Sequence, residues 1–452
     1  MFSEIIFILI IVGVSKQVRS LTCNFSNDTL GYECRFSGEN IQDESEMLPI
    51  FGEHKSGLSN DDVRRFYGYS STIKIFPSLI IDQFLYLESV SIYEINIEQF
   101  GRPISRCDRL SYLNMNNNNV TFIPGGIFQN CRNFRHFSIA NNQIRAIDKD
   151  AFIGTDLGTI YLMQNQIITL HPLTFTSLIN LESLLLSWNQ IESVHVETFR
   201  RSQKLLFLGL GNNKIQAWTK DHLPDQSKLW SLYLDQNQIK TLDADTFVNA
   251  PDLRTLALGY NFIEEIPEFE GLEQLESFQM FGGKVKHLSA ESFKNMKKLK
   301  YLTLSYNLIV TVNFTIDDNE NFLPEVKDIN LNGNRLTQIP KGSFQLPLNV
   351  EYLYINSNQL TALEADGIFP IDRLRVLSVE GNKINKIERE FFTNAANLSL
   401  NLKENRCWNG LVKLNNSDDP IIDSIIESCS SASTYKISFL IMIILGIASQ
   451  LF

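Results

Sequence analysis

The stretch YLDQNQIKTLDADTF, from Tyr233 to Phe247, decides the fold because the chain writes it more than once. A near copy, YLMQNQIITL, begins at Tyr161, and in both copies a Gln stands on each side of the same Asn. The pattern Leu-x-x-Leu-x-Leu-x-x-Asn-x-Leu returns from about Leu87 to Asn405, almost always after 24 residues. A fixed period of this length predicts a solenoid, in which each period forms one coil of the chain.

The residue types within each period indicate how a coil is built. Alternation at Leu-x-Leu predicts a short strand with one inward face, and neighbouring coils must stack to bury that face. The recurring Asn carries a carbonyl and an NH2 group, so it can satisfy inward-pointing backbone donors and acceptors at the turn after the strand. Ile95 and Gly283 stand where this Asn is expected in two coils. The expected Asn ladder consists of Asn118, Asn142, Asn165, Asn189, Asn213, Asn237, Asn261, Asn307, Asn334, Asn358, Asn382 and Asn405.

A Phe also recurs in the second half of the coils, in fragments such as IDKDAF and LDADTF. Rings at equivalent places in stacked coils lie close enough to contact one another. We therefore expect an aromatic column under the convex side, formed by Phe128, Phe152, Phe175, Phe199, Phe247, Phe293 and Phe344.

These repeats resemble the typical 24-residue class of extracellular leucine-rich repeat proteins, which includes Toll-type receptor ectodomains, Slit and adhesion proteins of the chaoptin and connectin kind. The resemblance covers about three quarters of the chain. It implies an α/β fold: a leucine-rich repeat solenoid, curved like a horseshoe, with a parallel β-sheet on the concave face and disulfide caps at both ends. The fragment NRCWNG resembles the family's C-terminal cap, which would place Trp408 over the last coil.

Both ends of the chain are apolar. Residues 5–14 have the length of a signal-peptide core, which predicts secretion and a mature start near Leu21. The tail from Ile437 to Phe452 follows small residues and resembles a GPI-attachment signal, with a short membrane helix as the alternative. The expected domains are a signal peptide (1–20), an N-terminal cap (21–70), leucine-rich repeats (71–405), a C-terminal cap (406–430) and a hydrophobic tail (431–452).

Six cysteines stand near the ends and in the early repeats. A secreted chain favours disulfides for Cys23 with Cys34 and for Cys407 with Cys429, which flank the start and the end, although six cysteines allow about 15 pairings. Cys107 and Cys131 occupy the same place in adjacent coils, about 5 Å apart, which predicts a bridge between coils. Glycosylation is predicted at the sequons of Asn24, Asn27, Asn119, Asn313, Asn397 and Asn415.

No constellation typical of catalysis is present in the sequence, so an enzyme, a cofactor and a metal site are not expected. Asp148, His171 and His195 follow the same apolar position in three consecutive coils and should form a line. A cation or pH-sensitive patch is conceivable there, but a solvated polar ladder is the simpler interpretation. The net charge of −11 argues against nucleic acid or an anionic membrane surface as the main partner.

The outward strand positions, from the Leu110 coil to the Leu374 coil, contain no Lys or Arg, and their only acids are Asp235, Asp328 and Glu380. Tyr and Phe favour strands in general, but that preference does not explain the missing cations. Gly209 and Gly211 should leave an apolar hollow among these positions. We predict a concave ligand surface for a protein, formed by Tyr161, Met163, Leu185, Phe207, Tyr233, Asp235, Tyr260, Phe281, Tyr301, Tyr306, Tyr352 and Tyr354.

The leading functional hypothesis is a non-catalytic extracellular protein-binding protein of the adhesion or receptor type, anchored by lipid to the cell surface. The alternative is a secreted innate-immune recognition factor that binds microbial or humoral components.

Overall fold

The computed structural model of the protein describes residues 21–29, 31–42, 50, 52–314, 323–340, 342, 344–345, 349–365, 367–369 and 371–430. The predicted signal peptide and the hydrophobic tail lie outside these residues. Two compact units divide the chain: residues 1–144 with 150–155, and residues 145–149 with 156–452. Within the described part, no helix has the length and apolar character that a membrane crossing requires.

The first unit begins with a hairpin, β1 (Asn24–Asp28) and β2 (Gly31–Ser37), whose strands pair antiparallel. From β2 the sheet continues in parallel through β4 (Val63–Tyr69), β6 (Ser89–Ile92), β7 (Tyr112–Asn114) and β9 (His136–Ser138). Its smaller elements are β3 (Asn40–Ile41), η2 (Asn60–Asp62), β5 (Thr72–Ile73), α1 (Ser78–Ile81) and β8 (Phe122–Ile123).

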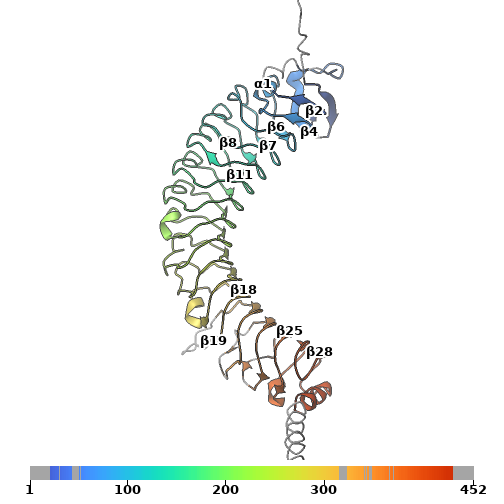
Figure 1. Ribbon diagram of the computed structural model, residues 1–452, viewed down its shortest axis with the longest axis vertical. Helices are drawn as coiled ribbons and strands as arrows, with labels where there is room; N and C mark the ends of the chain where they lie inside the picture. Colours follow the sequence, from blue (N-terminus) through green and yellow to red (C-terminus); the bar gives the residue numbers. More distant parts are fainter. Residues whose placement is uncertain are drawn as a thin grey trace, which may run out of the picture. The chain divides into compact units, whose positions relative to one another are not determined.

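The second unit carries a long parallel sheet with one short strand per coil (Figure 1). Every strand pairs with the next along the chain, in an unbroken register that places equivalent residues side by side. The strands are β11 (Thr159–Tyr161), β12 (Ser183–Leu185), β13 (Phe207–Gly209), β14 (Ser231–Tyr233), β15 (Thr255–Ala257), β16 (Ser277–Gln279), β18 (Tyr301–Thr303), β20 (Asp328–Asn330), β22 (Tyr352–Tyr354), β25 (Val376–Ser378) and β27 (Leu398–Asn401).

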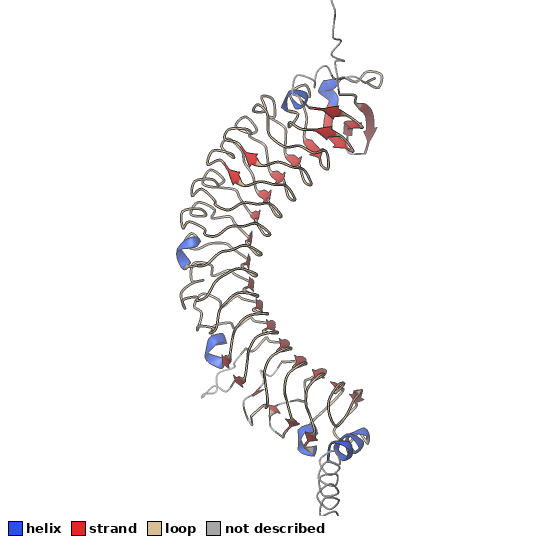
Figure 2. Cartoon of the chain, viewed as in Figure 1, coloured by secondary structure: helices blue, strands red, loops and turns tan. Residues whose placement is uncertain are grey.

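The return half of each coil in this unit is mostly irregular, as Figure 2 shows, so helices contribute little to the expected α/β fold. A 24-residue coil leaves little chain for a helix once its strand and turns are made. The return elements are β10 (Ala146–Ile147), η3 (Lys220–His222), β17 (His287–Ser289), η4 (Ala290–Phe293), β19 (Thr311–Asn313), β21 (Phe344–Gln345), β23 (Ala362–Leu363), β24 (Ile368–Phe369), β26 (Lys386–Ile387) and η5 (Arg389–Phe392).

The Asn ladder is confirmed, and Asn189 illustrates its chemistry. Its Nδ2 donates to the carbonyl oxygens of Leu162 (3.0 Å) and Leu186 (2.9 Å), and its Oδ1 accepts from the Ile167 N–H (3.0 Å). One side chain thus satisfies backbone groups in its own coil and in the preceding coil. Gly283, which stands where the ladder expects Asn, offers no such amide.

The aromatic column is confirmed for six of its seven predicted members, each fully buried: Phe128, Phe152, Phe175, Phe199, Phe247 and Phe293. The side chain of the seventh, Phe344, lies outside the described residues. The coil between Phe199 and Phe247 has no Phe at this place. There Trp218 is buried and stacks on His222 with ring centroids 4.6 Å apart.

All three predicted disulfides are present. The inter-coil pair, Cys107 and Cys131, has its Cα atoms 4.8 Å apart, as the shared place in adjacent coils predicted. Near the C-terminus, β28 (Leu411–Leu414) pairs antiparallel with β27 and covers the last strand edge. Ile422, in the helical segment 421–430, is fully buried, whereas Trp408 is only half-buried. Apolar residues of that segment therefore contribute to covering the core, beside the expected Trp408.

Candidate functional site

We define the inner face as the outward positions of the second unit's sheet from β11 to β25. It comprises the first and third residues of each strand and the residue two places after the strand. None of these positions holds Lys or Arg, and the only acids are Asp235, Asp328 and Glu380. The lysine of the next coil, Lys403, marks where this cation-free surface ends.

The parallel register brings the predicted residues of the inner face together in rows. In the first row, Tyr301 of β18 pairs with Asp328 of β20, which pairs with Tyr352 of β22. In the second row, Tyr161 pairs with Leu185 of β12. Because paired residues of neighbouring strands lie about 4.8 Å apart, each row is a line of adjacent side chains.

The predicted apolar hollow at Gly209 and Gly211 is wrong. Both glycines are buried, since side chains from the neighbouring coils lie over them. A Cβ on Gly209 would meet Leu185 Cδ2 at 2.9 Å, and one on Gly211 would meet Asp235 Oδ1 at 2.7 Å. The glycines therefore make room for Leu185 and Asp235 and leave no open hollow for a ligand.

Tyr260 and Tyr306 lie beside the strands, at the edge of the inner face. Both adopt the left-handed backbone conformation, with φ of 51° and 56°, in the turn that precedes the ladder Asn. Each ring lies over a glycine of the next coil: a Cβ on Gly282 would meet Tyr260 Cε1 at 2.2 Å, and one on Gly333 would meet Tyr306 Cδ1 at 2.5 Å. These two tyrosines therefore extend the surface toward the edge of the sheet.

Trp188 is not among the predicted site residues, although it occupies the same place in its coil. Its φ is 61° and its side chain is 57% exposed. The signal was available, because Trp188 immediately precedes the ladder residue Asn189, as Tyr260 precedes Asn261. Bulky residues pay a conformational penalty in this region that Asn or Gly largely avoids, so three exposed aromatics there are unusual.

Burial perturbs the two acids nearest the middle of the inner face. It raises the pKa of Asp235, an effect opposed by hydrogen bonds from its own backbone and from Gln236. Burial also raises the pKa of Asp328, and no cation among the described residues opposes this effect. The pKa of Tyr354 is raised first by burial and then by the negative charge of Asp328. The inner face is thus partly desolvated and negative where it is charged.

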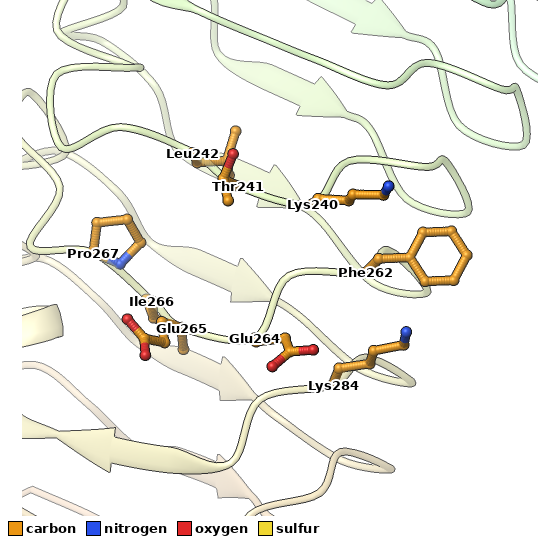
Figure 3. A pocket seen from close by; sticks show the side chains of 9 residues that line it. All are labelled: Lys240, Thr241, Leu242, Phe262, Glu264, Glu265, Ile266, Pro267 and Lys284. Carbon is orange, nitrogen blue, oxygen red and sulfur yellow. The ribbon is translucent and has the colours of Figure 1, made fainter.

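A hollow of about 850 Å³ lies on the flank of the second unit, outside the inner face (Figure 3). The coil that begins at Leu253 is shorter than its neighbours and contributes Phe262 and Pro267 to the lining. The Lys284 Nζ lies 4.7 Å from the centroid of the Phe262 ring, and the Lys286 Nζ pairs with Glu264 at 2.7 Å. Figure 3 shows Lys240, Phe262 and Lys284 pointing the same way along one edge. Lys284 and Glu264 of the lining thus have partners within the chain.

The predicted line of Asp148, His171 and His195 stays a prediction, and the structure shows the two His side chains exposed. The Nδ1 atoms of His171 and His195 accept from the backbone N–H groups of Leu173 and Glu197, each at 3.1 Å. Throughout the described residues, no group of three His, Cys, Asp or Glu side chains is placed to hold a metal ion.

The six sequons stay predictions of glycosylation. Five of their Asn side chains are exposed, and that of Asn119 is half-buried and donates to Asn96 Oδ1 at 3.3 Å. Asn313, in β19, lies on the return half of its coil, away from the inner face.

The leucine-rich repeat family model matches four stretches of the chain, residues 108–167, 155–215, 227–285 and 324–384, which together cover half of it. The chain belongs to the leucine-rich repeat proteins. Among curated relatives it is similar to podocan of Mus musculus, with 30% identity over 296 residues. That match covers 63% of this chain and only 38% of podocan, so the chain spans well under half of this relative.

Solved leucine-rich repeat structures share this fold. The LRR protein LIC12759 of Leptospira interrogans has a TM-score of 0.63 and 24% identity, over 76% of this chain and 85% of its own. The LRIM1/APL1C complex has a TM-score of 0.64 and 16% identity, and the match covers 96% of this chain and 78% of the chain in the complex. The Toll–Spätzle complex of Drosophila has a TM-score of 0.61 and 18% identity, and the match covers 76% of this chain and 51% of the chain in the complex. At these identities the solved structures establish the repeat fold.

Proposed function

We propose that this leucine-rich repeat protein is a non-catalytic extracellular recognition molecule that binds a protein ligand on its inner face. One observation carries the proposal: a sheet face that is free of Lys and Arg from β11 to β25 presents exposed aromatic rings. Interface cores are depleted of charge and enriched in Tyr, Trp and Phe. A solvated face with no partner would normally carry charges of both signs.

The exposure of the rings supports a binding role over a role in the fold. Tyr301 is 53% exposed, and Phe207 and Tyr233 are also exposed, while the Leu residues that alternate with them are buried. The core of the solenoid is therefore complete without these rings. Tyr and Phe bury a large area for few rotatable bonds, which makes them efficient anchors for a partner.

Location outside the cell is part of the same proposal. All six cysteines are paired, and disulfides persist in oxidising compartments. The sequence adds the predicted signal peptide at 1–20 and the predicted anchor at 431–452, which flank the caps and repeats. We favour a cell-surface adhesion or receptor-type role over a secreted immune-recognition role because of this predicted anchor.

Replacing Tyr301, Tyr352 and Tyr354 together with Ala tests the inner face. We expect cross-linking of the full-length protein on cells to lose its partner band, with binding weakened at least about tenfold, because hot-spot aromatics contribute about 2 kcal/mol or more each. The temperature of unfolding should change little, since these side chains lie outside the core.

The matched control replaces two exposed apolar side chains outside the inner face, Phe122 and Ile179, which are 43% and 62% exposed. This variant should keep the partner band. Unaltered cross-linking in the triple Tyr variant, or an equal loss in the control, would move the binding site to the outer side or to a cap.

A further inference from the structure

One carboxylate of the inner face stands between two tyrosines. Strands β18, β20 and β22 are hydrogen-bonded neighbours, and their register places Tyr301, Asp328 and Tyr352 in one row. Side chains in such a row point to the same side of the sheet, about 4.8 Å apart. Tyr301 is exposed, and Asp328 and Tyr352 are half-buried. The row therefore opens to solvent while its charged member is partly removed from water.

The Asp328 carboxylate has no hydrogen-bond or ion-pair partner among the described residues. The neighbouring Lys300 does not serve it, because its Nζ binds the Glu276 carboxylate at 2.7 Å. Lys327, the residue before Asp328, is exposed outside the row, and no cation offsets the effect of burial on the Asp328 carboxylate. The charge is thus held at a place where the described part of the fold gives it no counterion.

Acids that are buried elsewhere in the described chain do have partners. Asp82 binds Arg102 at 2.8 Å and accepts from the backbone N–H groups of Ser105 and Arg106. Glu33, which is almost fully buried, pairs with Arg65 at 3.2 Å. Asp82 and Glu33 thus have cationic partners within the fold, whereas Asp328 has none among the described residues, which points to a cation supplied from outside.

The surroundings of Asp328 select the kind of cation. Tyrosine rings attract cations over their faces, and a carboxylate binds a guanidinium through two parallel hydrogen bonds. A planar guanidinium can also stack on an aromatic ring, which a compact ammonium cannot do. The other charges of the inner face, Asp235 and Glu380, are acids as well, so the field of the whole face favours a basic partner.

We propose that Tyr301, Asp328 and Tyr352 form a receptor site for one arginine side chain of the protein partner. The guanidinium lies between the two rings and pairs with the Asp328 carboxylate. This inference rests on the inner face being the ligand surface, and it adds the chemistry by which the ligand is recognised.

The test measures binding to streptavidin that carries four copies of a biotinylated peptide, Gly-Ser-Gly-Arg-Gly-Ser-Gly. Matched peptides replace Arg with Lys or with citrulline, which keeps the planar shape of arginine without its charge. We expect the full-length protein to bind the Arg form about tenfold more tightly than the citrulline form. The Lys form should be intermediate. Equal binding of the Arg and citrulline forms would overturn the proposal.

Variants of the protein test whether the preference for the Arg peptide arises at Tyr301, Asp328 and Tyr352. Asp328→Asn keeps the shape of the side chain and should abolish the preference for Arg, and Tyr301→Leu with Tyr352→Leu should reduce it. Asp225→Asn, an exposed acid outside the inner face, should retain it. Asp235→Asn removes the same charge from the inner face at a position flanked by Gly211 and Gly259. If Asp235→Asn loses as much of the preference for the Arg peptide as Asp328→Asn does, the general negative charge of the face attracts the peptide and the proposed site does not.

A separate measurement distinguishes failure of the arginine site from failure of the proposed function. Phe207→Ala with Tyr233→Ala disturbs the inner face at strands remote from β20. If this double variant loses the cross-linked partner while Asp328→Asn keeps it and binds Arg and citrulline peptides equally, the inner face remains the ligand surface and the arginine site is wrong.

Discussion

At the scale of the residue, one backbone position in each coil determines which side chain lies at the edge of the inner face. The residue before the ladder Asn has positive φ in coil after coil, and Asn or Gly fills the place in several of them, such as Asn212 and Gly381. Three coils place Trp188, Tyr260 or Tyr306 there instead. Each large side chain accepts a conformational cost of about 1–2 kcal/mol and remains exposed, which indicates a role outside folding.

Gly282→Ala tests the position of the Tyr260 ring. The new Cβ would lie 2.2 Å from the present ring and must displace it, so partner binding should weaken. Gly381→Ala is the matched control, because its φ of 68° is close to the 66° of Gly282 and its nearest neighbour, Ser357 Oγ, is 3.4 Å away. Both variants should lose about 1 kcal/mol of unfolding free energy in urea titrations. Equal partner binding by the two variants would remove Tyr260 from the ligand surface.

At the scale of the element, the coil from Leu205 to Lys228 has Leu223 at the place of the recurring Phe and a pair of stacked rings close to it. His222 is buried under Trp218; its Nδ1 accepts from the Thr219 N–H at 3.0 Å, and its Nε2 donates to the Val194 carbonyl oxygen at 3.1 Å. Burial lowers the pKa of His222, since a charged imidazole is disfavoured away from water. The folded coil therefore holds this ring in its neutral form.

This coil should make the stability of the protein sensitive to mild acid. A lowered pKa in the folded state means that the unfolded chain binds the proton first, so the His222 contribution is complete above its unfolded pKa of about 6.5 and falls as the pH drops through it. We expect the unfolding temperature to decrease between pH 7.5 and pH 5. In His222→Thr, which places the Thr of the adjacent coils (Thr198 and Thr246) at this position, the decrease should be smaller. An identical decrease in the variant would exclude His222 as its source.

At the scale of the whole molecule, each coil contacts mainly its neighbours, so the repeats and the caps have separate tasks. The hairpin of β1 and β2 begins the first unit, and β28 with the helical segment 421–430 ends the second. The repeats between these ends supply the surface proposed for recognition. The predicted tail would then hold the recognition surface at the membrane.

Treatment of intact expressing cells with a phosphatidylinositol-specific phospholipase tests the predicted anchor. A GPI anchor attached near the small residues at 430–433 predicts that most of the protein moves into the medium, because the enzyme cuts the lipid and leaves the protein whole. A variant in which charged residues interrupt the apolar tail should lack the anchor and be absent from the surface. Protein that stays with treated cells would support the short membrane helix, and protein already in the medium would support the secreted alternative.

The sequence by itself determined the coils, because each period carries its own buried Leu, Asn and Phe and needs only its neighbours to complete a core. It also determined the cation-free character of the inner face and the inter-coil bridge of Cys107 and Cys131, since equivalent places in adjacent coils are adjacent in space. Only the tertiary structure decided what covers each position. It placed Leu185 and Asp235 over the glycines of the expected hollow and Tyr260 and Tyr306 at the edge. It also left Asp328 half-buried, with no counterion in the part of the chain that the structure describes. These outcomes depend on side-chain packing between coils and on local backbone conformation, which the spacing of residues along the chain does not specify.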